Sequence, residues 1–254
     1  MSALRIAQIT DCHLKSDKTG DFYGCQPYQN LSIILAEIAD NQHNLDAVLL
    51  TGDLIQDEVW QSYQNFIDLL DSHKWNIPFY LIPGNHDVPE LFERFACHPV
   101  FKACKSAESI VQKKWQILLF NSYAHNRNGA GHISKSQLDT KISQISSDIT
   151  NILVVLHHHL VPFNSFIDKY DLQDSDCFKD WLKQEDKIKA IVHGHVHSIA
   201  SGYIFDKTWF ACPASSVEFG HGDEFEVKEI RPRYQIVELS DDGQVQVSVK
   251  SLNL

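Results

Sequence analysis

Hydrophobic positions along the chain alternate between two kinds of segment. Short continuous runs of branched and aromatic residues predict strands, and each run ends at polar residues. Six such runs lie in the first three quarters of the chain: Leu4–Thr10, Ala47–Thr51, Phe79–Ile82, Gln116–Asn121, Ile152–Leu156 and Ala190–His193. Between them apolar residues recur at helical spacing, as in Leu31, Ile34, Leu35 and Ile38, and in Tyr63, Phe66, Ile67 and Leu70. Strands buried on both faces and covered by helices follow from this pattern.

After His197 the pattern changes to short strands alone. These are Gly202–Phe205, Thr208–Cys212, Tyr234–Leu239 and Val245–Val249. Asp241-Asp-Gly243 is a turn signal between the last two, so we expect a C-terminal meander. No internal repeat or Pro/Gly/Ser-rich linker is present. We therefore predict one domain over residues 1–254, with an α/β (in some schemes α+β) architecture.

Charge and composition exclude some classes of binding partner. The formal net charge is -11 at pH 7 with histidine neutral, and such a surface repels polyanions, so nucleic acid and anionic membranes are not expected partners. The N-terminus has no signal-peptide pattern, and no apolar run approaches the roughly 20 residues that span a bilayer. The six cysteines show no close paired spacing. We expect a soluble, cytoplasmic monomer or homodimer with reduced thiols.

Residue types that bind metals follow five of the predicted strands. They are Asp11 and His13, then Asp53, then Asn85 with His86 and Asp87, then His157 with His158 and His159, and finally His195 and His197. Loops beyond the carboxyl ends of strands converge on one crevice in an α/β sheet, so these side chains can meet. Carboxylate and amide oxygens with neutral imidazoles suit Mn, Fe, Zn or Mg. Their number fits two ions, with one carboxylate such as Asp53 shared between them.

Each of these signals has a simpler interpretation when taken alone. Aspartate and histidine after a strand are often caps or turn residues, and Gly52-Asp53 is a common turn dipeptide. Asn85 could cap a helix that begins near Pro89. Five signals at strand ends nevertheless favour a metal site. Glycines at positions 52, 84 and 194 would permit the close backbone approach that such loops need.

The ordered blocks Asp11-x-His13, Gly52-Asp53, Gly84-Asn85-His86-Asp87, His157 and Gly194-His195-x-His197 resemble the calcineurin-like metallophosphoesterase superfamily. More closely, residues 9–14, 51–57, 115–119 and 157–159 resemble bacterial 3′,5′-cyclic-AMP phosphodiesterases of the class III type. This resemblance covers nearly the whole chain. It implies a four-layer αββα sandwich of two mixed β-sheets flanked by helices, with a dinuclear metal site at the C-terminal ends of the strands.

The resemblance also implies a role for each ligand. One metal would be held by Asp11, His13 and His197, the other by Asn85, His157 and His195, with Asp53 bridging. His157 matches the first histidine of the family's His-His-Pro-Pro pattern, which leaves His158 and His159 without an assigned role. The implied cofactors are two divalent ions, Mn and/or Fe, with Zn or Mg as alternatives.

The implied reaction is hydrolysis of cyclic AMP, or another small phosphodiester, to a 5′-monophosphate. Our hypothesis is in-line attack by a metal-bridging hydroxide, with His86 protonating the leaving alkoxide and Asp87 orienting His86. Alternatives are a glycerophosphodiester or other small phosphodiester or monoester hydrolase, a nuclease, and a non-catalytic metal-binding regulatory protein. The acidic charge makes the nuclease the weaker of these.

Substrate choice must lie outside the metal ligands. We expect the irregular stretch 164–176 to be a loop beside the site. Segment 213–221 is the second candidate lining, with Ser215, Ser216, Glu218, Phe219 and His221. Where relatives carry a His-Gly pair this chain has Ala130-Gly131-His132, so either His132 contacts the phosphate or that contact is lost. Leu160 stands where a proline is common.

Overall fold

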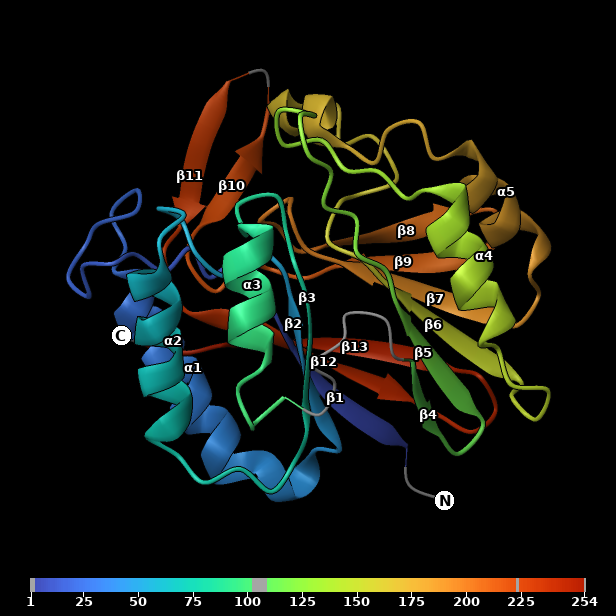
Figure 1. The fold of residues 1–254 in the computed structure, drawn as a ribbon, viewed down its shortest axis with the longest axis horizontal. Coiled ribbons are helices and arrows are strands. Elements are labelled where there is room, and N and C mark those ends of the chain that lie inside the picture. The colour runs from blue at the N-terminus through green and yellow to red at the C-terminus, as the bar shows by residue number, and fades with distance from the viewer. Residues whose placement is uncertain (1–2, 102–108, 223, 254) are drawn as a thin grey trace.

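Two β-sheets lie face to face between two layers of helices (Figure 1). The computed structural model describes residues 3–101, 109–222 and 224–253. The first sheet has the order β13-β12-β1-β2-β3, with parallel β1, β2 and β3 and antiparallel β12 and β13. Its strands are β1 (Leu4–Ile9), β2 (Ala47–Thr51), β3 (Phe79–Ile82), β12 (Arg233–Leu239) and β13 (Val245–Ser251).

The second sheet has the order β4-β5-β6-β7-β9-β8. Its inner strands β5, β6, β7 and β9 run parallel, and β4 and β8 pair antiparallel at the two edges. The strands are β4 (Ile110–Gln112), β5 (Trp115–Leu119), β6 (Asn151–Val155), β7 (Ile188–His193), β8 (Ala200–Ile204) and β9 (Lys207–Ala211). Both sheets are therefore mixed.

Helices cover the outer face of each sheet. The first sheet carries α1 (Pro27–Asn41), α2 (Trp60–Asp71) and α3 (Pro89–Ala96), and the second carries α4 (Lys135–Ser143) and α5 (Asp176–Gln184). Short 3-10 turns lie at Gln42–Asn44 (η1) and Phe166–Tyr170 (η2). One apolar cluster lies under each helical layer, and a third, which includes Ile6, Leu49, Leu153 and Val192, fills the space between the sheets. The predicted fold class is confirmed.

The C-terminal strands differ from the predicted meander. They form three hairpins in three places: β8 and β9 extend the second sheet, β12 and β13 extend the first, and β10 (Glu218–His221) pairs only with β11 (Phe225–Glu229). The meander prediction was wrong because alternation in a strand shows that one face is buried, but not against which sheet.

Two further expectations concern membrane-spanning helices and the redox state of the cysteines. Among the described helices, none is long and apolar enough to cross a membrane. The described cysteines, Cys12, Cys25, Cys97, Cys177 and Cys212, are free thiols. Cys104, which we also expect to be reduced, lies outside the described residues.

Candidate functional site

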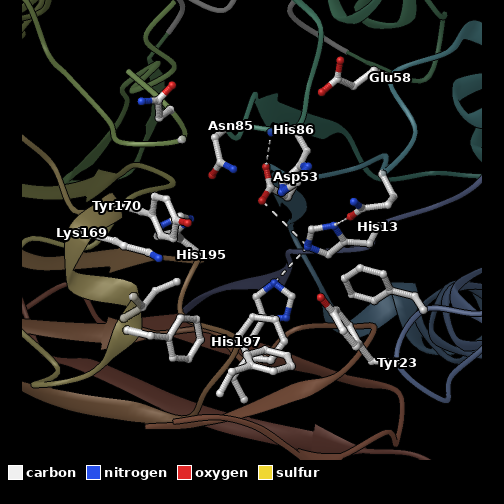
Figure 2. Close-up of a pocket in the computed structure, with 18 residues that line it drawn as sticks. His13, Tyr23, Asp53, Glu58, Asn85, His86, Lys169, Tyr170, His195 and His197 are labelled. Carbon is white, nitrogen blue, oxygen red and sulfur yellow. Dashed lines mark hydrogen bonds and ion pairs between the residues drawn. The ribbon is translucent and has the colours of Figure 1, made fainter. Parts of the chain in front are cut away.

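The loops that follow β1 and β2 are bound to each other along their backbones. Asp11 N donates to Gly52 O at 2.9 Å, and His13 N donates to Asp53 O at 3.0 Å. The loops after β6 and β7 in the second sheet are joined in the same way, since Gly194 N donates to His157 O at 3.1 Å. Loops from both sheets therefore meet at one edge of the sandwich, and Figure 2 shows the side chains that converge there.

Five of the seven predicted metal ligands have left-handed backbones. Their φ angles lie between 49° and 70°, at Asp11, His13, Asp53, His195 and His197. Such conformations are uncommon outside glycine and gather at functional sites, where the surrounding contacts enforce them. The loops are also closely packed, because a Cβ atom at Gly84 would overlap Asp53 Oδ1 and one at Gly194 would overlap Thr10 Oγ1. The expected close approach of these glycines is confirmed.

One group of predicted ligands consists of Asp11, His13 and His197. The Nε2 atoms of His13 and His197 lie 3.0 Å apart, and His197 Nε2 lies 3.3 Å from Asp11 Oδ1. Each imidazole has an oxygen next to its other nitrogen: Gln56 Oε1 lies 2.7 Å from His13 Nδ1, and Val217 O lies 2.9 Å from His197 Nδ1. If each Nδ1 carries the proton, both Nε2 lone pairs are directed into the space beside Asp11.

The second group lies around His157. Its Nδ1 can donate to Thr51 O at 2.8 Å, so its Nε2 is free to face Asn85 Oδ1 at 3.3 Å and His195 Nδ1 at 3.2 Å. Asp53 lies between the two groups, with Oδ2 3.4 Å from His157 Nε2 and 3.9 Å from His13 Nε2. The structure thus brings all seven predicted ligands together, with the expected bridging residue in the middle.

Electrostatics favour the metal-binding forms of three predicted ligands, Asp53, Asp11 and His13. Burial opposes the charge of Asp53, but the neighbouring histidines, His157, His86 and His13, together hold the pKa of Asp53 well below its usual value. Burial also opposes the charge of Asp11, but His197 and His157 together lower the pKa of Asp11. Burial and the charge of His197 lower the pKa of His13 to about 3. Anionic carboxylates and a neutral imidazole are the states that metal binding requires.

His157 shows how strongly the site attracts positive charge. Burial favours its neutral form, yet Asp53, Asp11 and the Thr51 carbonyl together raise the pKa of His157 to about 9. The group next to these carboxylates therefore gains a proton readily in the absence of another cation. A divalent ion can take the place of that proton.

The three adjacent histidines have different surroundings. Only His157 directs a ring nitrogen at Asn85 and Asp53. Both ring nitrogens of His158 have neighbours of their own, Ser122 Oγ at 2.8 Å and Gly129 O at 3.1 Å. His159 lies 3.4 Å from Asp168 Oδ1 in η2. The choice of the first histidine as the ligand agrees with this geometry.

His86 lines the cavity and is partly exposed, with its ring edge-on to His13 at 5.1 Å between centroids. Its backbone N donates to Asp53 Oδ1 at 2.8 Å, which ties it to the predicted bridging carboxylate. This position suits a group that acts on a substrate held at the ligands.

Asp87 joins the loops on which the predicted ligands lie. Its buried carboxylate accepts hydrogen bonds from Gly84 N at 2.8 Å, Leu54 N at 3.2 Å and Tyr63 OH at 2.7 Å. These bonds join the loop after β3 to the loop after β2 and to α2. Its oxygens therefore hold these loops together, and its role in orienting His86 stays a prediction.

Five of the seven predicted ligands, His13, Asp53, Asn85, His195 and His197, line an open cavity of about 600 Å³, within the range of roughly 300–1,000 Å³ typical of small-ligand sites. Besides predicted ligands and His86, its lining includes Phe22, Tyr23, Gln56, Glu58, Asn128, Gly129, Phe166, Ile167, Lys169, Tyr170, Phe219 and Phe225. Of the described lining residues, Lys169 is the sole lysine or arginine. Figure 2 shows Lys169 and Tyr23 on opposite sides of the cavity.

The two segments predicted to line the pocket differ in how many residues reach it. Stretch 164–176 does border the site through Phe166, Ile167, Lys169 and Tyr170, as expected. From segment 213–221, only Phe219 belongs to the described lining.

The other four candidates of that segment have structural partners. Ser215 N donates to Thr10 O, Ser216 Oγ donates to Asp11 O, Glu218 pairs with Arg233, and His221 lies within hydrogen-bonding distance of Ser165 Oγ and Val196 O. Ser215 and Ser216 are buried beneath the first ligand loop. The sequence pattern could not separate these roles, because polar residues both line pockets and support loops.

His132 lies outside the cavity lining, so its contact with a phosphate stays a prediction. Its Nδ1 lies 3.2 Å from Gln173 O, and it is not among the residues that line the cavity. Gly131 is constrained instead by His158, because a Cβ atom there would overlap the His158 ring. Asn128 and Gly129, from the same loop, reach the cavity.

Several lining residues were missed at the level of sequence. Gln56 belongs to the 51–57 motif, yet the motif alone did not predict that its Oε1 atom contacts His13 Nδ1. Tyr23 and Gly24 follow Asp21 in a turn-like sequence that could have indicated a tight turn. Nothing in the local pattern would have placed Lys169 or Phe225 at the site.

Comparison with known proteins identifies phosphoesterases as relatives of this chain. The family model described as calcineurin-like phosphoesterase matches residues 4–198. A probable cyclic nucleotide phosphodiesterase of Colwellia psychrerythraea is 34% identical over 257 residues, covering 98% of this chain and 95% of that protein. The 3′,5′-cyclic adenosine monophosphate phosphodiesterase CpdA of Haemophilus influenzae is 30% identical over 252 residues, covering 98% of this chain and 90% of that one.

Solved structures with a similar fold are also found. A dimetal phosphatase from Danio rerio has a TM-score of 0.66 at 13% identity, covering 99% of both chains. At this identity the match supports the architecture alone.

Proposed function

Because the chain belongs to the calcineurin-like phosphoesterase family, we propose that it is a dinuclear-metal phosphodiesterase that hydrolyses 3′,5′-cyclic AMP to 5′-AMP. Membership in a phosphoesterase family makes the chain a hydrolase. The choice of cyclic AMP is supported by the relatives at 34% and 30% identity, which are named as cyclic nucleotide phosphodiesterases.

The observation that carries the metal assignment is the pair of imidazole nitrogens at 3.0 Å. His13 Nε2 and His197 Nε2 cannot hydrogen-bond to each other when both protons are on Nδ1, and Asp11 Oδ1 beside them is buried without a hydrogen-bond partner. Buried lone pairs that face one another are unfavourable unless a cation lies between them. The residues therefore fit a divalent ion.

Asp11, His13 and His197 would hold one ion, and Asn85, His157 and His195 the other, with Asp53 shared. When bound, two such ions supply Lewis acidity to the phosphoryl oxygens and lower the pKa of a water that attacks phosphorus in line. Oxygen and imidazole ligands favour Mn and/or Fe, and Zn or Mg remain compatible with the same set.

His86 would protonate the departing 3′ oxygen. It lies at the cavity wall next to Asn85, and its backbone is tied to Asp53, so its position relative to both ligand groups is fixed. General-acid catalysis by a positioned histidine typically contributes about 10²–10⁴-fold to the rate. The single lysine of the described lining, Lys169, would attract the phosphate anion into an otherwise acidic protein.

The experiment that tests the proposal is a substrate panel with metal-reconstituted protein. Cyclic AMP, bis(4-nitrophenyl) phosphate, glycerophosphoethanolamine and single-stranded DNA would be compared at equal concentration with added Mn. We expect cyclic AMP to have the highest kcat/KM and the product to be 5′-AMP.

Other outcomes would assign another function. A preference for glycerophosphoethanolamine would replace cyclic AMP with a glycerophosphodiester, and cleavage of DNA alone would indicate a nuclease. Failure to hydrolyse any substrate by protein with two bound metals would favour a non-catalytic metal-binding protein.

A further inference from the structure

Two large aromatic side chains are exposed side by side at the rim of the cavity. Tyr23 is 55% exposed and Phe225 is 44% exposed, and their ring centroids lie 5.1 Å apart with an interplanar angle of 50°. Both line the same cavity as the metal ligands. A patch of exposed rings beside a binding cavity indicates a surface that a ligand covers.

The backbone at Tyr23 is held in an unfavourable conformation. Tyr23 has φ 51° and Gly24 has φ 90°, and Phe22 and Cys25 on either side exchange both backbone hydrogen bonds, at 2.9 and 3.1 Å. This is a tight two-residue turn with positive φ at both central positions, which glycine or asparagine normally occupies. A bulky tyrosine in such a position is a local strain of the kind that accumulates at functional sites.

Each rim ring rests on a second ring that stacks on a predicted metal ligand. Tyr23 lies 4.8 Å from Phe22, whose ring stacks on His13 at 4.5 Å. Phe225 lies 5.1 Å from Phe219, whose ring stacks on His197 at 4.0 Å and 4°.

Of the two supporting rings, Phe219 belongs to a small apolar cluster with Cys25 and Val217, separate from the main cores, and Phe22 packs against that cluster. The rim rings are thus held at a defined, short separation from the ligands of one metal. A substrate held at those ligands would therefore have the rim rings close by.

We propose that Tyr23 and Phe225 form the aromatic surface against which the base of the nucleotide substrate stacks. The inference rests on the proposed function and makes it more specific. Every nucleobase presents a π-face, and base–aromatic stacking depends little on which base is bound. The site would therefore select substrates that carry a planar heteroaromatic group over those that lack one, and discriminate only weakly among bases.

Binding of two ligands that differ by the base tests this surface without turnover. Adenosine 5′-monophosphate and ribose 5-phosphate would be titrated calorimetrically into metal-loaded protein. Stacking on an aromatic side chain changes affinity by about fivefold to about 150-fold per base. We expect wild-type protein to bind the nucleotide more tightly by a factor in this range, and Tyr23→Ala/Phe225→Ala to lose most of that preference while its affinity for ribose 5-phosphate is unchanged.

Three control variants separate stacking from other effects. Tyr23→Phe and Phe225→Tyr keep the rings and should keep the preference, which also excludes a role for the Tyr23 hydroxyl. Tyr203→Ala removes a 77% exposed ring on β8 that does not line the cavity, and should change neither affinity. The proposal is overturned if wild-type protein binds both ligands equally or fails to bind the nucleotide, or if the double variant keeps the preference or loses affinity for both ligands alike.

These results are independent of the substrate panel. Wild-type protein that prefers the nucleotide but hydrolyses only other diesters would contradict the proposed substrate and leave the aromatic surface intact. Protein that hydrolyses cyclic AMP but binds both ligands equally would support the proposed substrate and contradict the aromatic surface.

Discussion

The Nε2 atoms of His13 and His197 lie 3.0 Å apart, while the Nδ1 atom of each ring lies within 2.9 Å of an oxygen acceptor. Residues from the loop after β1 and the loop after β7 are therefore brought together with their lone pairs facing the same space. Buried Asp11 and Asp53 border that space. Packing of two sheets creates this arrangement, and a bound cation would relieve it.

Removal of metal should consequently destabilise the folded protein. A ligand at a hundredfold excess over its Kd contributes about 2.7 kcal/mol to stability, and for a chain of this size each kcal/mol shifts Tm by roughly 2–4 °C. We expect a chelator to lower Tm by several degrees in differential scanning calorimetry, and added Mn to restore it. Asn44→Ala, an exposed substitution in η1, should retain the full shift. An identical Tm with and without chelator, in protein shown to have lost its metal, would contradict the assignment.

Replacement of His86 should separate catalysis from metal binding. We expect His86→Ala to reduce kcat about 10²–10⁴-fold, because the leaving oxygen would lose its proton donor. Metal content measured by mass spectrometry should stay at two ions per chain. As a control, His125→Ala removes an exposed histidine that borders only the adjacent smaller cavity and should retain activity. Unchanged kcat in the His86 variant would show that another group donates the proton.

Lys169 should contribute mainly to binding of the anionic substrate. Loss of one charge contact worth about 1.4 kcal/mol corresponds to a tenfold change in affinity. We expect Lys169→Gln to raise KM by about tenfold, with a smaller change in kcat and a weaker dependence on salt. Lys183→Gln, on the exposed last turn of α5, is the matched charge control. Equal effects of both variants would indicate loss of net charge rather than a contact in the cavity.

Gly84 should tolerate no side chain. A Cβ atom there would overlap Asp53 Oδ1 and the Asp53 backbone nitrogen, both of which are fixed by the ligand loops. Overpacking of this kind costs about 1–3 kcal/mol. We expect Gly84→Ala to lower the free energy of unfolding in urea by that amount and to weaken metal binding.

Gly222→Ala is the control for this substitution, since no atom lies within 4 Å of a Cβ at that position. Both glycines lie in loops, and neither has a positive φ, so conformational strain is comparable and only the available space differs. A Gly84→Ala protein as stable as Gly222→Ala would show that the loops can relax.

Local residue order was sufficient to predict much of this molecule. Continuous apolar runs predicted the inner strands to within a few residues, because strands buried on both faces have few polar positions. The residues after those runs predicted the ligand set, because a metal needs particular donor atoms and those cannot be substituted freely. His86 and the loop that contains Phe166 were predicted beside the site for the same local reasons.

Tertiary structure decided everything that depends on which segments meet. Strand alternation does not reveal the partner sheet, so the hairpins β8–β9 and β12–β13 lie in different sheets although their patterns are alike. In the sequence Asp87 is simply a carboxylate beside His86, but the groups that donate hydrogen bonds to it, Leu54 N and Tyr63 OH, come from another loop and from a helix. Lys169, Tyr23 and Phe225 belong to three segments that the chain order keeps far apart. Their common cavity exists only because the two sheets pack face to face and bring these loops to one edge.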